Sequence, residues 1–139
     1  IEKIIKEFYR LKEKCKLYAV INDLKYLKNS GRLSSSSAVI GSMLNVKPIV
    51  SIVDGKVVNI KKCMGANQAD SFMLAQIKEI DPAHDFYFIH SDNIPAIEKL
   101  KEKYLPKLPQ GQKITSCEIG CVVGSHVGPR CYGFVYFEK

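Results

Sequence analysis

Two strand-like segments that flank Asp54-Gly55 constrain the fold of this chain more than any other feature. The segments, 48–53 and 56–60, are rich in valine and isoleucine, residue types that pack well on a pleated sheet. An Asp-Gly pair readily adopts the positive φ angles of a two-residue hairpin turn. We therefore expect a pair of antiparallel strands here, which excludes a purely parallel sheet.

The rest of the chain alternates between helical and strand-like patterns. Apolar residues at helical spacing, or capping residues ahead of them, predict helices over 1–11, 24–27, 38–44, 69–80 and 94–104. Short apolar runs predict strands over 16–21, 86–90, 113–119 and 133–137. Residues 121–123 fit either a strand or one helical turn. This order predicts an α/β fold of the α+β type, in two layers: a mixed sheet with helices mainly on one face.

The length of 139 residues is enough for one domain with a real core, so we expect a single domain over 1–139. No apolar run approaches the roughly 20 residues that a membrane span needs. Charged residues interrupt the first segment, so no signal peptide is expected. The chain begins with Ile1 in a predicted helix rather than with methionine, and we expect it to be a piece of a longer protein.

The net charge of +7 is compatible with a nucleic-acid partner, but the excess of lysine over arginine argues against one. Of the 21 cationic residues, 18 are dispersed lysines, and the arginines are Arg10, Arg32 and Arg130. Nucleic-acid readers favour clustered arginine with aromatic neighbours. We expect no nucleic-acid partner and keep a basic nucleic-acid-binding module as an alternative.

The five cysteines are an odd number and lie mostly in apolar contexts. Reduced thiols and a cytoplasmic location are therefore expected rather than a disulfide framework. Cys117 and Cys121 are separated by three residues, whereas zinc ligands usually come in two tighter pairs. Buried thiols that act as small hydrophobic residues fit the pattern better, and we expect no metal and no cofactor.

His126 is the strongest candidate for a ligand-binding side chain. It lies between Gly124 and Gly128, just ahead of a proline, and glycines permit positive φ angles and close approach of a ligand. An imidazole in such a segment can donate a hydrogen bond to a carboxylate. The alternative is a histidine bonded within its own loop, and for His84 and His90 a structural role is expected.

A second polar segment contains Arg32 and the serine run 34–37. Arginine binds carboxylate or phosphate through two parallel hydrogen bonds, and a helix N-terminus adds free N–H donors. Arg32 and the serines can therefore form an anion pocket beside the apolar residues of 38–46. Arg32 can equally bond the carbonyls of two helix ends.

Motifs of several enzyme classes are missing from the chain. It contains no phosphate-binding loop, no Gly-x-Ser-x-Gly element and no His-Glu-x-x-His helix. The remaining enzymatic interpretation is a thiol nucleophile, Cys121 or Cys131, activated by His126. We expect a protein that is not an enzyme and keep the thiol enzyme as an alternative.

Two short motifs carry a family resemblance: Gly-Arg-Leu-Ser at 31–34 and His-Val-Gly-Pro at 126–129. Further matching pieces, in the same order, lie at 23–28, 44–50, 54–56 and Gly120. From about residue 15 onward, the chain thus resembles the second, C-terminal domain of the DegV family, the bacterial fatty-acid-binding proteins.

The resemblance implies a mixed sheet of roughly six strands and a carrier that holds a long-chain fatty acid between two domains. The first, N-terminal domain is absent from this chain. A partner is also implied, a fatty acid kinase related to dihydroxyacetone kinase that receives the carboxylate. The implied carboxylate ligands are His126 and Arg32, and the further pocket residues expected are Ser34, Gly128, Ile40 and Leu44.

Two residues depart from the family pattern. Arg130 follows His-Val-Gly-Pro where the family usually has glycine, and Met64 lies where members that work with the kinase often carry arginine. Without the first domain, half of the lipid tunnel is open and exposes an apolar patch, and such patches promote association. We therefore expect the chain on its own to self-associate.

Overall fold

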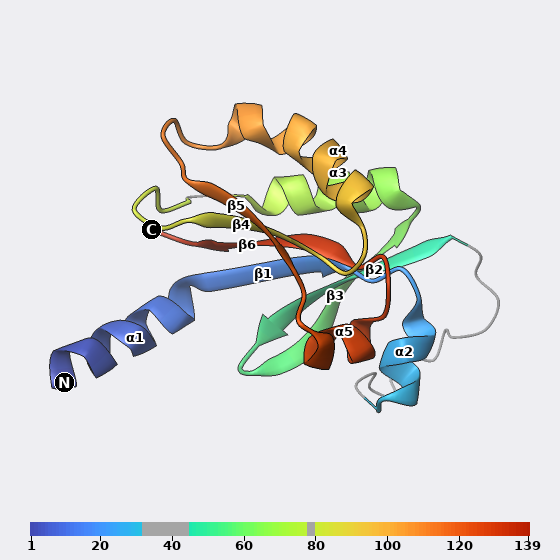
Figure 1. The fold of residues 1–139 in the computed structure, drawn as a ribbon, viewed down its shortest axis with the longest axis horizontal. Coiled ribbons are helices and arrows are strands. Elements are labelled where there is room, and N and C mark those ends of the chain that lie inside the picture. The colour runs from blue at the N-terminus through green and yellow to red at the C-terminus, as the bar shows by residue number, and fades with distance from the viewer. Residues whose placement is uncertain (32–44, 78–79) are drawn as a thin grey trace.

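The structure is a computed structural model that describes residues 1–31, 45–77 and 80–139. Figure 1 shows one sheet with helices on both faces and a first helix that extends away from it. The elements are α1 (Glu2–Lys14), β1 (Cys15–Val20), α2 (Leu24–Asn29), β2 (Val46–Val53), β3 (Lys56–Met64), α3 (Ala66–Gln76), β4 (Phe86–His90), α4 (Ile94–Tyr104), η1 (Leu105–Lys107), β5 (Ile114–Glu118), α5 (Cys121–Val127) and β6 (Tyr132–Phe137).

The six strands form one mixed sheet in the order β3-β2-β1-β6-β4-β5. β4 and β5 are parallel, and the other neighbours are antiparallel. The hairpin at Asp54-Gly55 is confirmed: Val53 pairs with Lys56, and the φ angles at Asp54 and Gly55 are 51° and 73°. Two positive φ angles in a two-residue loop match the twist of the flanking strands.

One face of the sheet carries the main core, covered by α3 and α4 (Figure 1). Aromatic side chains dominate it, since Phe86 packs against Phe88 and Phe134 with ring centroids 5.1 and 5.5 Å apart. Tyr104 of α4 closes the cluster from above, with its ring centroid 5.5 Å from that of Phe134. Rings of this size bury much of the apolar surface that stabilises a small domain.

The opposite face carries the two short helices, α2 and α5 (Figure 1). Leu27 of α2 and Val127 of α5 pack there on a small cluster that includes Ala19, Val50 and Cys131. The prediction of helices mainly on one face is thus confirmed in the sense that the longer helices, α3 and α4, share a face. The described residues cover the second face only in part, and the candidate site lies on it.

Two boundary predictions were resolved or corrected by the structure. Residues 121–123, left open between strand and helix, begin α5. The helix predicted to run to Ile80 ends at Gln76, and Ile80 instead forms a bridge with Glu138 beside the sheet. Ile80 is buried in the main core, so its apolar character suits either position. The helix predicted over 38–44 lies outside the described residues.

Among the described residues, no helix has the length and apolar character of a membrane span.

Candidate functional site

His126 lies in the last turn of α5, not in a loop. The segment around it is helical from Cys121 to Val127, and the N–H of Gly128 donates to the carbonyl of Gly124 at 2.8 Å. Gly124 has an ordinary helical conformation, whereas Gly128 ends the helix at φ 75°. Of the two glycines that flank His126, only Gly128 thus uses the left-handed region that favours glycine.

Gly128 is buried under the ring of Tyr26 from α2. A Cβ atom at position 128 would lie 2.4 Å from Cδ2 of Tyr26, far closer than any real contact. α2 is held in place by Asp23, whose carboxylate caps the helix by accepting from the Lys25 N–H at 3.0 Å. The chain therefore needs glycine at 128 for two reasons, backbone conformation and space.

The loop after Gly128 is tied to the end of β4. Arg130 N–H donates to the Ser91 carbonyl at 2.7 Å, and Ser91 N–H donates to the Cys131 carbonyl at 2.9 Å. The side chain of Asn93 adds a bond to the Arg130 carbonyl at 3.0 Å. The hydroxyl of Ser91 also faces α5, since it lies 3.9 Å from the position of a Cβ built on Gly124.

The site thus combines three segments distant in sequence: α2, the loop after β4, and α5 with its exit. Sequence reasoning missed Tyr26, Ser91 and Asn93 as neighbours of the His126 segment. A signal existed for the loop, because polar residues directly after a buried strand mark the carboxyl edge of a parallel strand pair, where sites often form. No local pattern identified Tyr26.

Apolar side chains that the described residues cover only in part share the sheet face with α5, which carries His126. Leu17 and Tyr87 flank Val135 on neighbouring strands, and all three are half-buried. Leu17 packs against the small cluster under α2 and α5, which places this row on that face. Exposed apolar residues continue it on α5 and the β2–β3 hairpin: Val122, Val123, Ile52 and Val57.

Four of the six predicted site residues lie outside the described residues: Arg32, Ser34, Ile40 and Leu44. The structure therefore places His126 near the end of α5 and Gly128 just after it, and it brings Gly128 against Tyr26. The half-buried Lys47 of β2 donates from its ammonium group to Oδ1 of Asn22, just after β1.

Cys131 is not a reactive thiol. It is fully buried, and burial raises its pKa to about 12, so the thiolate that nucleophilic catalysis needs is scarcely populated near neutral pH. Cys131 is therefore ruled out as the nucleophile in the thiol-enzyme alternative. Cys121 is exposed. Within the part of the chain that the structure describes, no three His, Cys, Asp or Glu side chains are grouped as metal ligands.

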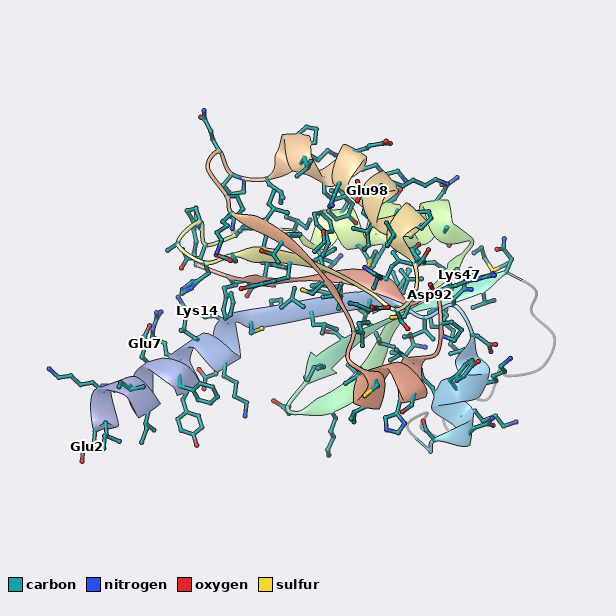
Figure 2. The ribbon with its side chains drawn as sticks, viewed as in Figure 1. Glu2, Glu7, Lys14, Lys47, Asp92 and Glu98 are labelled. Carbon is teal, nitrogen blue, oxygen red and sulfur yellow. The ribbon has the colours of Figure 1, made fainter. Side chains whose placement is uncertain are left out.

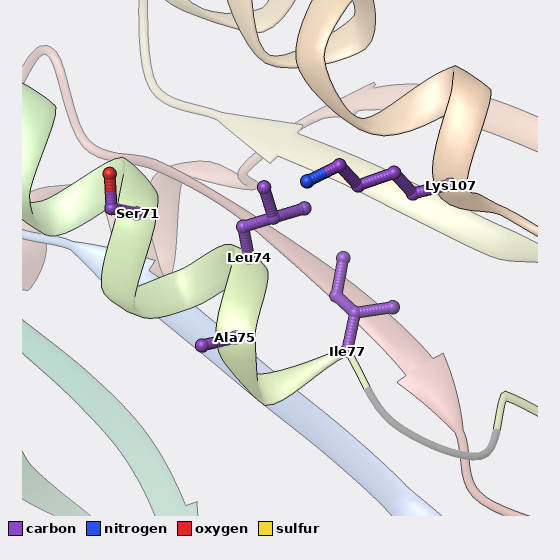
Figure 3. A pocket seen from close by; sticks show the side chains of 5 residues that line it. All are labelled: Ser71, Leu74, Ala75, Ile77 and Lys107. Atoms are coloured by element: carbon purple, nitrogen blue, oxygen red, sulfur yellow. The ribbon is translucent and has the colours of Figure 1, made fainter.

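A cavity of about 310 Å³ lies elsewhere, between α3 and η1. Figure 3 shows Ser71, Leu74, Ala75, Ile77 and Lys107 around it. Leu74 and Ile77 pack on the main core, so this hollow belongs to the face opposite His126. Its walls offer one ammonium group and one hydroxyl among apolar atoms, and nothing in it converges on a ligand.

The chain matches known proteins along nearly all of its length. Residues 1–139 match the family described as "Uncharacterised protein, DegV family". A DegV domain-containing protein of Clostridium acetobutylicum is 30% identical over 139 residues, which cover 98% of this chain and 49% of that protein. The chain therefore spans about half the length of the curated relatives it matches.

Solved structures give the same relation. The fatty acid binding DegV family protein from Streptococcus agalactiae has a TM-score of 0.85 and 29% identity, with 100% of this chain and 50% of that one covered. DegV from Bacillus subtilis, described as a fatty acid binding protein, has a TM-score of 0.79 and 30% identity over 99% of this chain and 50% of its own.

Proposed function

Because this chain belongs to the DegV family, we propose that it is part of a lipid carrier that binds a long-chain fatty acid without transforming it. His126 donates to the carboxylate of the fatty acid, and the acyl chain lies on the uncovered apolar face of the sheet. Similar proteins from Streptococcus agalactiae and Bacillus subtilis are fatty acid binding proteins.

The observation that carries the proposal is the position of His126. Its helix lies on the sheet face with the half-buried row of Leu17, Val135 and Tyr87. A fatty acid has the matching composition, one anionic group and a long apolar chain. An imidazole bonds the carboxylate, while burial of the chain supplies about 0.8 kcal/mol for each CH₂ group.

The rest of the proposed site remains as the sequence predicts it. Arg32 is the second carboxylate ligand, Ser34 adds a hydroxyl, and Gly128 lets α5 end directly against Tyr26, which positions the His126 turn. Ile40 and Leu44 line the acyl chain. The carrier works in the cytoplasm, and a fatty acid kinase is its proposed partner. Family members that work with this kinase often carry an arginine in the region of Met64. In this chain Met64 is exposed at the end of β3.

The test is fatty-acid binding by the full-length protein that the gene encodes. We expect long-chain fatty acid to copurify and to be identified by mass spectrometry after lipid extraction. The change His126→Ala is expected to weaken binding roughly 10- to 100-fold, because a hydrogen bond to a charged group contributes about 1.5–3 kcal/mol.

The matched control is His84→Ala. His84 lies in the turn that contains Asp81, and its imidazole packs near the ring of Phe137. We expect this variant to bind as the parent does. If no fatty acid copurifies with the protein and none binds to it, the carrier function is contradicted. Equal effects of the two variants contradict the role of His126.

Thiol labelling against pH separates the carrier from the thiol-enzyme alternative. For the carrier, labelling of the exposed Cys121 is expected to follow an ordinary thiol profile, with no fast phase near neutral pH that His126→Ala removes. A fast phase that depends on His126 is the result that favours the enzyme.

A further inference from the structure

Phe137 is the last apolar residue on β6 and lies on the sheet face that carries α5. Side chains alternate along a strand, and Phe134 and Tyr136 belong to the main core, so Phe137 points to the opposite face. It is half-buried there and pairs with Cys15, the first residue of β1. Figure 2 shows Lys14 at the same end of the sheet, where α1 joins β1.

The helix that carries His126 leads into the other end of the same strand. α5 is followed by β6, which begins at Tyr132, and the strand rises roughly 17 Å from there to Phe137, at about 3.4 Å per residue. Val135 lies between the two ends on the α5 face, half-buried and paired with Leu17. An acyl chain that starts at His126 and follows β6 therefore crosses Val135 before it reaches Phe137.

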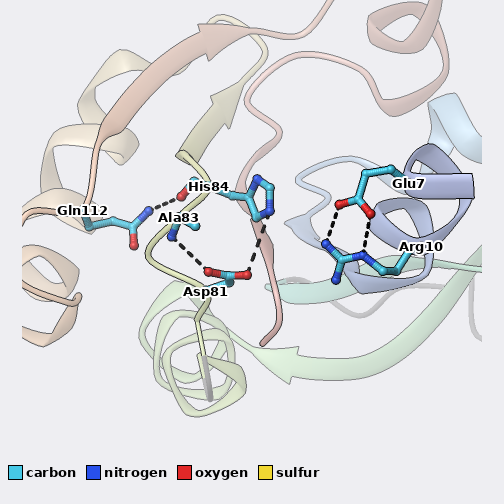
Figure 4. Close-up of polar contacts among 6 residues, drawn as sticks. All are labelled: Glu7, Arg10, Asp81, Ala83, His84 and Gln112. Atoms are coloured by element: carbon cyan, nitrogen blue, oxygen red, sulfur yellow. Dashed lines mark hydrogen bonds and ion pairs between the residues drawn. The ribbon is translucent and has the colours of Figure 1, made fainter. Parts of the chain in front are cut away.

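Polar groups begin directly beyond Phe137. The N–H of Asp81 donates to the Phe137 carbonyl at 2.8 Å, so the turn 81–84 lies against the end of β6. Figure 4 shows this turn, in which one Asp81 oxygen accepts from the Ala83 N–H at 2.9 Å and the other lies 3.9 Å from Nε2 of His84. The ring of His84 packs on that of Phe137, with centroids 4.8 Å apart. A carboxylate and an imidazole thus mark the end of the apolar face.

Further charged groups border the same end of the sheet. Asp85, the residue before β4, pairs with Lys113 at 2.7 Å. On α1, Glu7 pairs with Arg10, on which the charge of Asp81 also acts, and Figure 4 shows this pair and the turn together. An acyl chain that continued past the end of β6 would take water from charged groups. That loss outweighs the gain from one more buried CH₂ group.

We propose that Phe137 is the stop for the acyl chain and so sets the longest fatty acid that gains affinity. The inference rests on the function proposed above and adds a residue that selects among fatty acids. Each CH₂ group covered before the stop raises the affinity about fourfold. A CH₂ group beyond the stop remains in water or meets charged groups, so it adds no affinity.

A chain-length series on the delipidated full-length protein tests the stop. Affinities are measured for saturated fatty acids from decanoic to docosanoic acid by displacement of a fluorescent fatty acid. For the parent protein we expect a rise of about fourfold per CH₂ group, followed by a plateau. Phe137→Ala is expected to move the plateau to longer acids and to raise the affinity for the longest ones roughly tenfold, because about two more CH₂ groups are covered.

Two further variants guard against a general effect of mutation. Val135→Phe puts a ring on the path before the stop and is expected to move the plateau to shorter acids, the opposite direction. Phe72→Ala is the matched control, since it removes a half-buried phenylalanine from α3 on the main-core face. We expect it to keep the series of the parent. The thermal midpoint of each variant shows whether it is folded, and Val135→Phe carries the test if Phe137→Ala is not.

Three results overturn the proposal. One is a parent series without a plateau. Another is a plateau that neither Phe137→Ala nor Val135→Phe moves, and the third is an equal shift in Phe72→Ala. In each of these results fatty acids still bind, so the carrier function stands while the role of Phe137 fails. If no acid in the series binds at all, the carrier function fails and the stop fails with it.

Discussion

Arg130 holds a backbone conformation that arginine rarely adopts. Its φ angle is 62°, in the left-handed region that costs a residue with a Cβ atom roughly 1–2 kcal/mol. The bonds of its N–H to Ser91 and of its carbonyl to Asn93 hold it there. Arginine in place of the family glycine therefore also costs backbone energy.

Replacing Arg130 by glycine is expected to stabilise the protein by about 0.5–1 kcal/mol. Glycine relieves the left-handed strain but loses more conformational freedom on folding, so the gain is smaller than the strain itself. Denaturant unfolding measures the difference. Arg130→Ala removes the charge and keeps the strain, so it is expected to give no gain. If alanine stabilises as much as glycine, the charge of Arg130 and not its backbone is the cause.

Gly128 is the residue whose replacement is expected to be most damaging at the site. Gly128→Ala adds a Cβ atom at φ 75° and forces it toward the Tyr26 ring, so we expect a loss of about 3 kcal/mol or more, the strain and the overlap together. Gly111→Ala is the control, because φ there is 78° with nothing within 4 Å. We expect it to lose only about 1–2 kcal/mol in the same denaturation experiment. Equal losses contradict the contact with Tyr26.

At the scale of elements, Asp70 joins three of them. It lies on α3 and accepts from the Tyr132 hydroxyl of β6 at 2.9 Å and from the Lys103 ammonium of α4 at 2.8 Å. Its own backbone carbonyl accepts from Tyr104 at 3.0 Å. Both helices on the main face are thereby bonded to one another and to the first residue of β6.

Removal of the Asp70 carboxylate is expected to cost about 2–3 kcal/mol, because Asp70→Ala leaves the buried Tyr132 hydroxyl without its acceptor. Thermal or denaturant unfolding measures it. Glu98→Ala, which breaks the exposed pair with Lys101 on α4, is the control and is expected to cost at most about 0.5 kcal/mol. A small loss for Asp70→Ala indicates that the hydroxyl finds water or another partner.

Elements encoded by neighbouring residues could be predicted from the sequence. The hairpin follows from Asp54-Gly55, and the helix at 94–104 matches α4 because its apolar spacing and boundary signals lie within it. Two glycines flank His126 and permit positive φ angles on both sides of it, so the sequence does not predict a helix there. Gly124 is nevertheless helical, since the packing of Val127 on Leu27 and its neighbours stabilises α5 as a whole.

At the scale of the whole molecule, contacts between residues far apart in the sequence could not be predicted. Tyr26 meets Gly128 across more than a hundred residues, and Asp70 meets Tyr132 across 62. Such pairs carry no periodicity or motif, because they depend on the strand order. Of the site residues that the sequence predicts, His126 and Gly128 lie in the described part of the chain, and their neighbours follow from the sheet, which brings α2, α5 and the loop after β4 together.

The buried acidic groups predict how stability depends on alkaline pH. Burial raises the pKa of Cys131 to about 12 and raises the pKa of Tyr104 and of Tyr132 as well. Unfolded, these groups ionise from their ordinary values of 9.0 and 10.0, so above about pH 9 the unfolded chain releases protons that the folded chain retains. The stabilisation they contribute is full below pH 9 and falls as pH rises toward the folded values.

We expect the free energy of unfolding to decline between pH 9 and pH 11, and we expect these groups to cause no change in it with pH below pH 9. Tyr132→Phe removes one of them and is expected to make the decline shallower. Urea titrations at pH 8, 9.5 and 10.5 measure both slopes. Stability that stays level up to pH 11 is the outcome that contradicts this assignment.

The strand order has a consequence for how the sheet avoids pairing with other chains. β3 and β5 are its two edges, and an unpaired edge is a template for aggregation. β5 has only five residues, and the nine residues of β3 include Lys56, Lys61 and Lys62, all exposed. Short length and lysine are the two usual defences of an edge strand. Part of the positive charge of this chain therefore acts to keep copies of it apart.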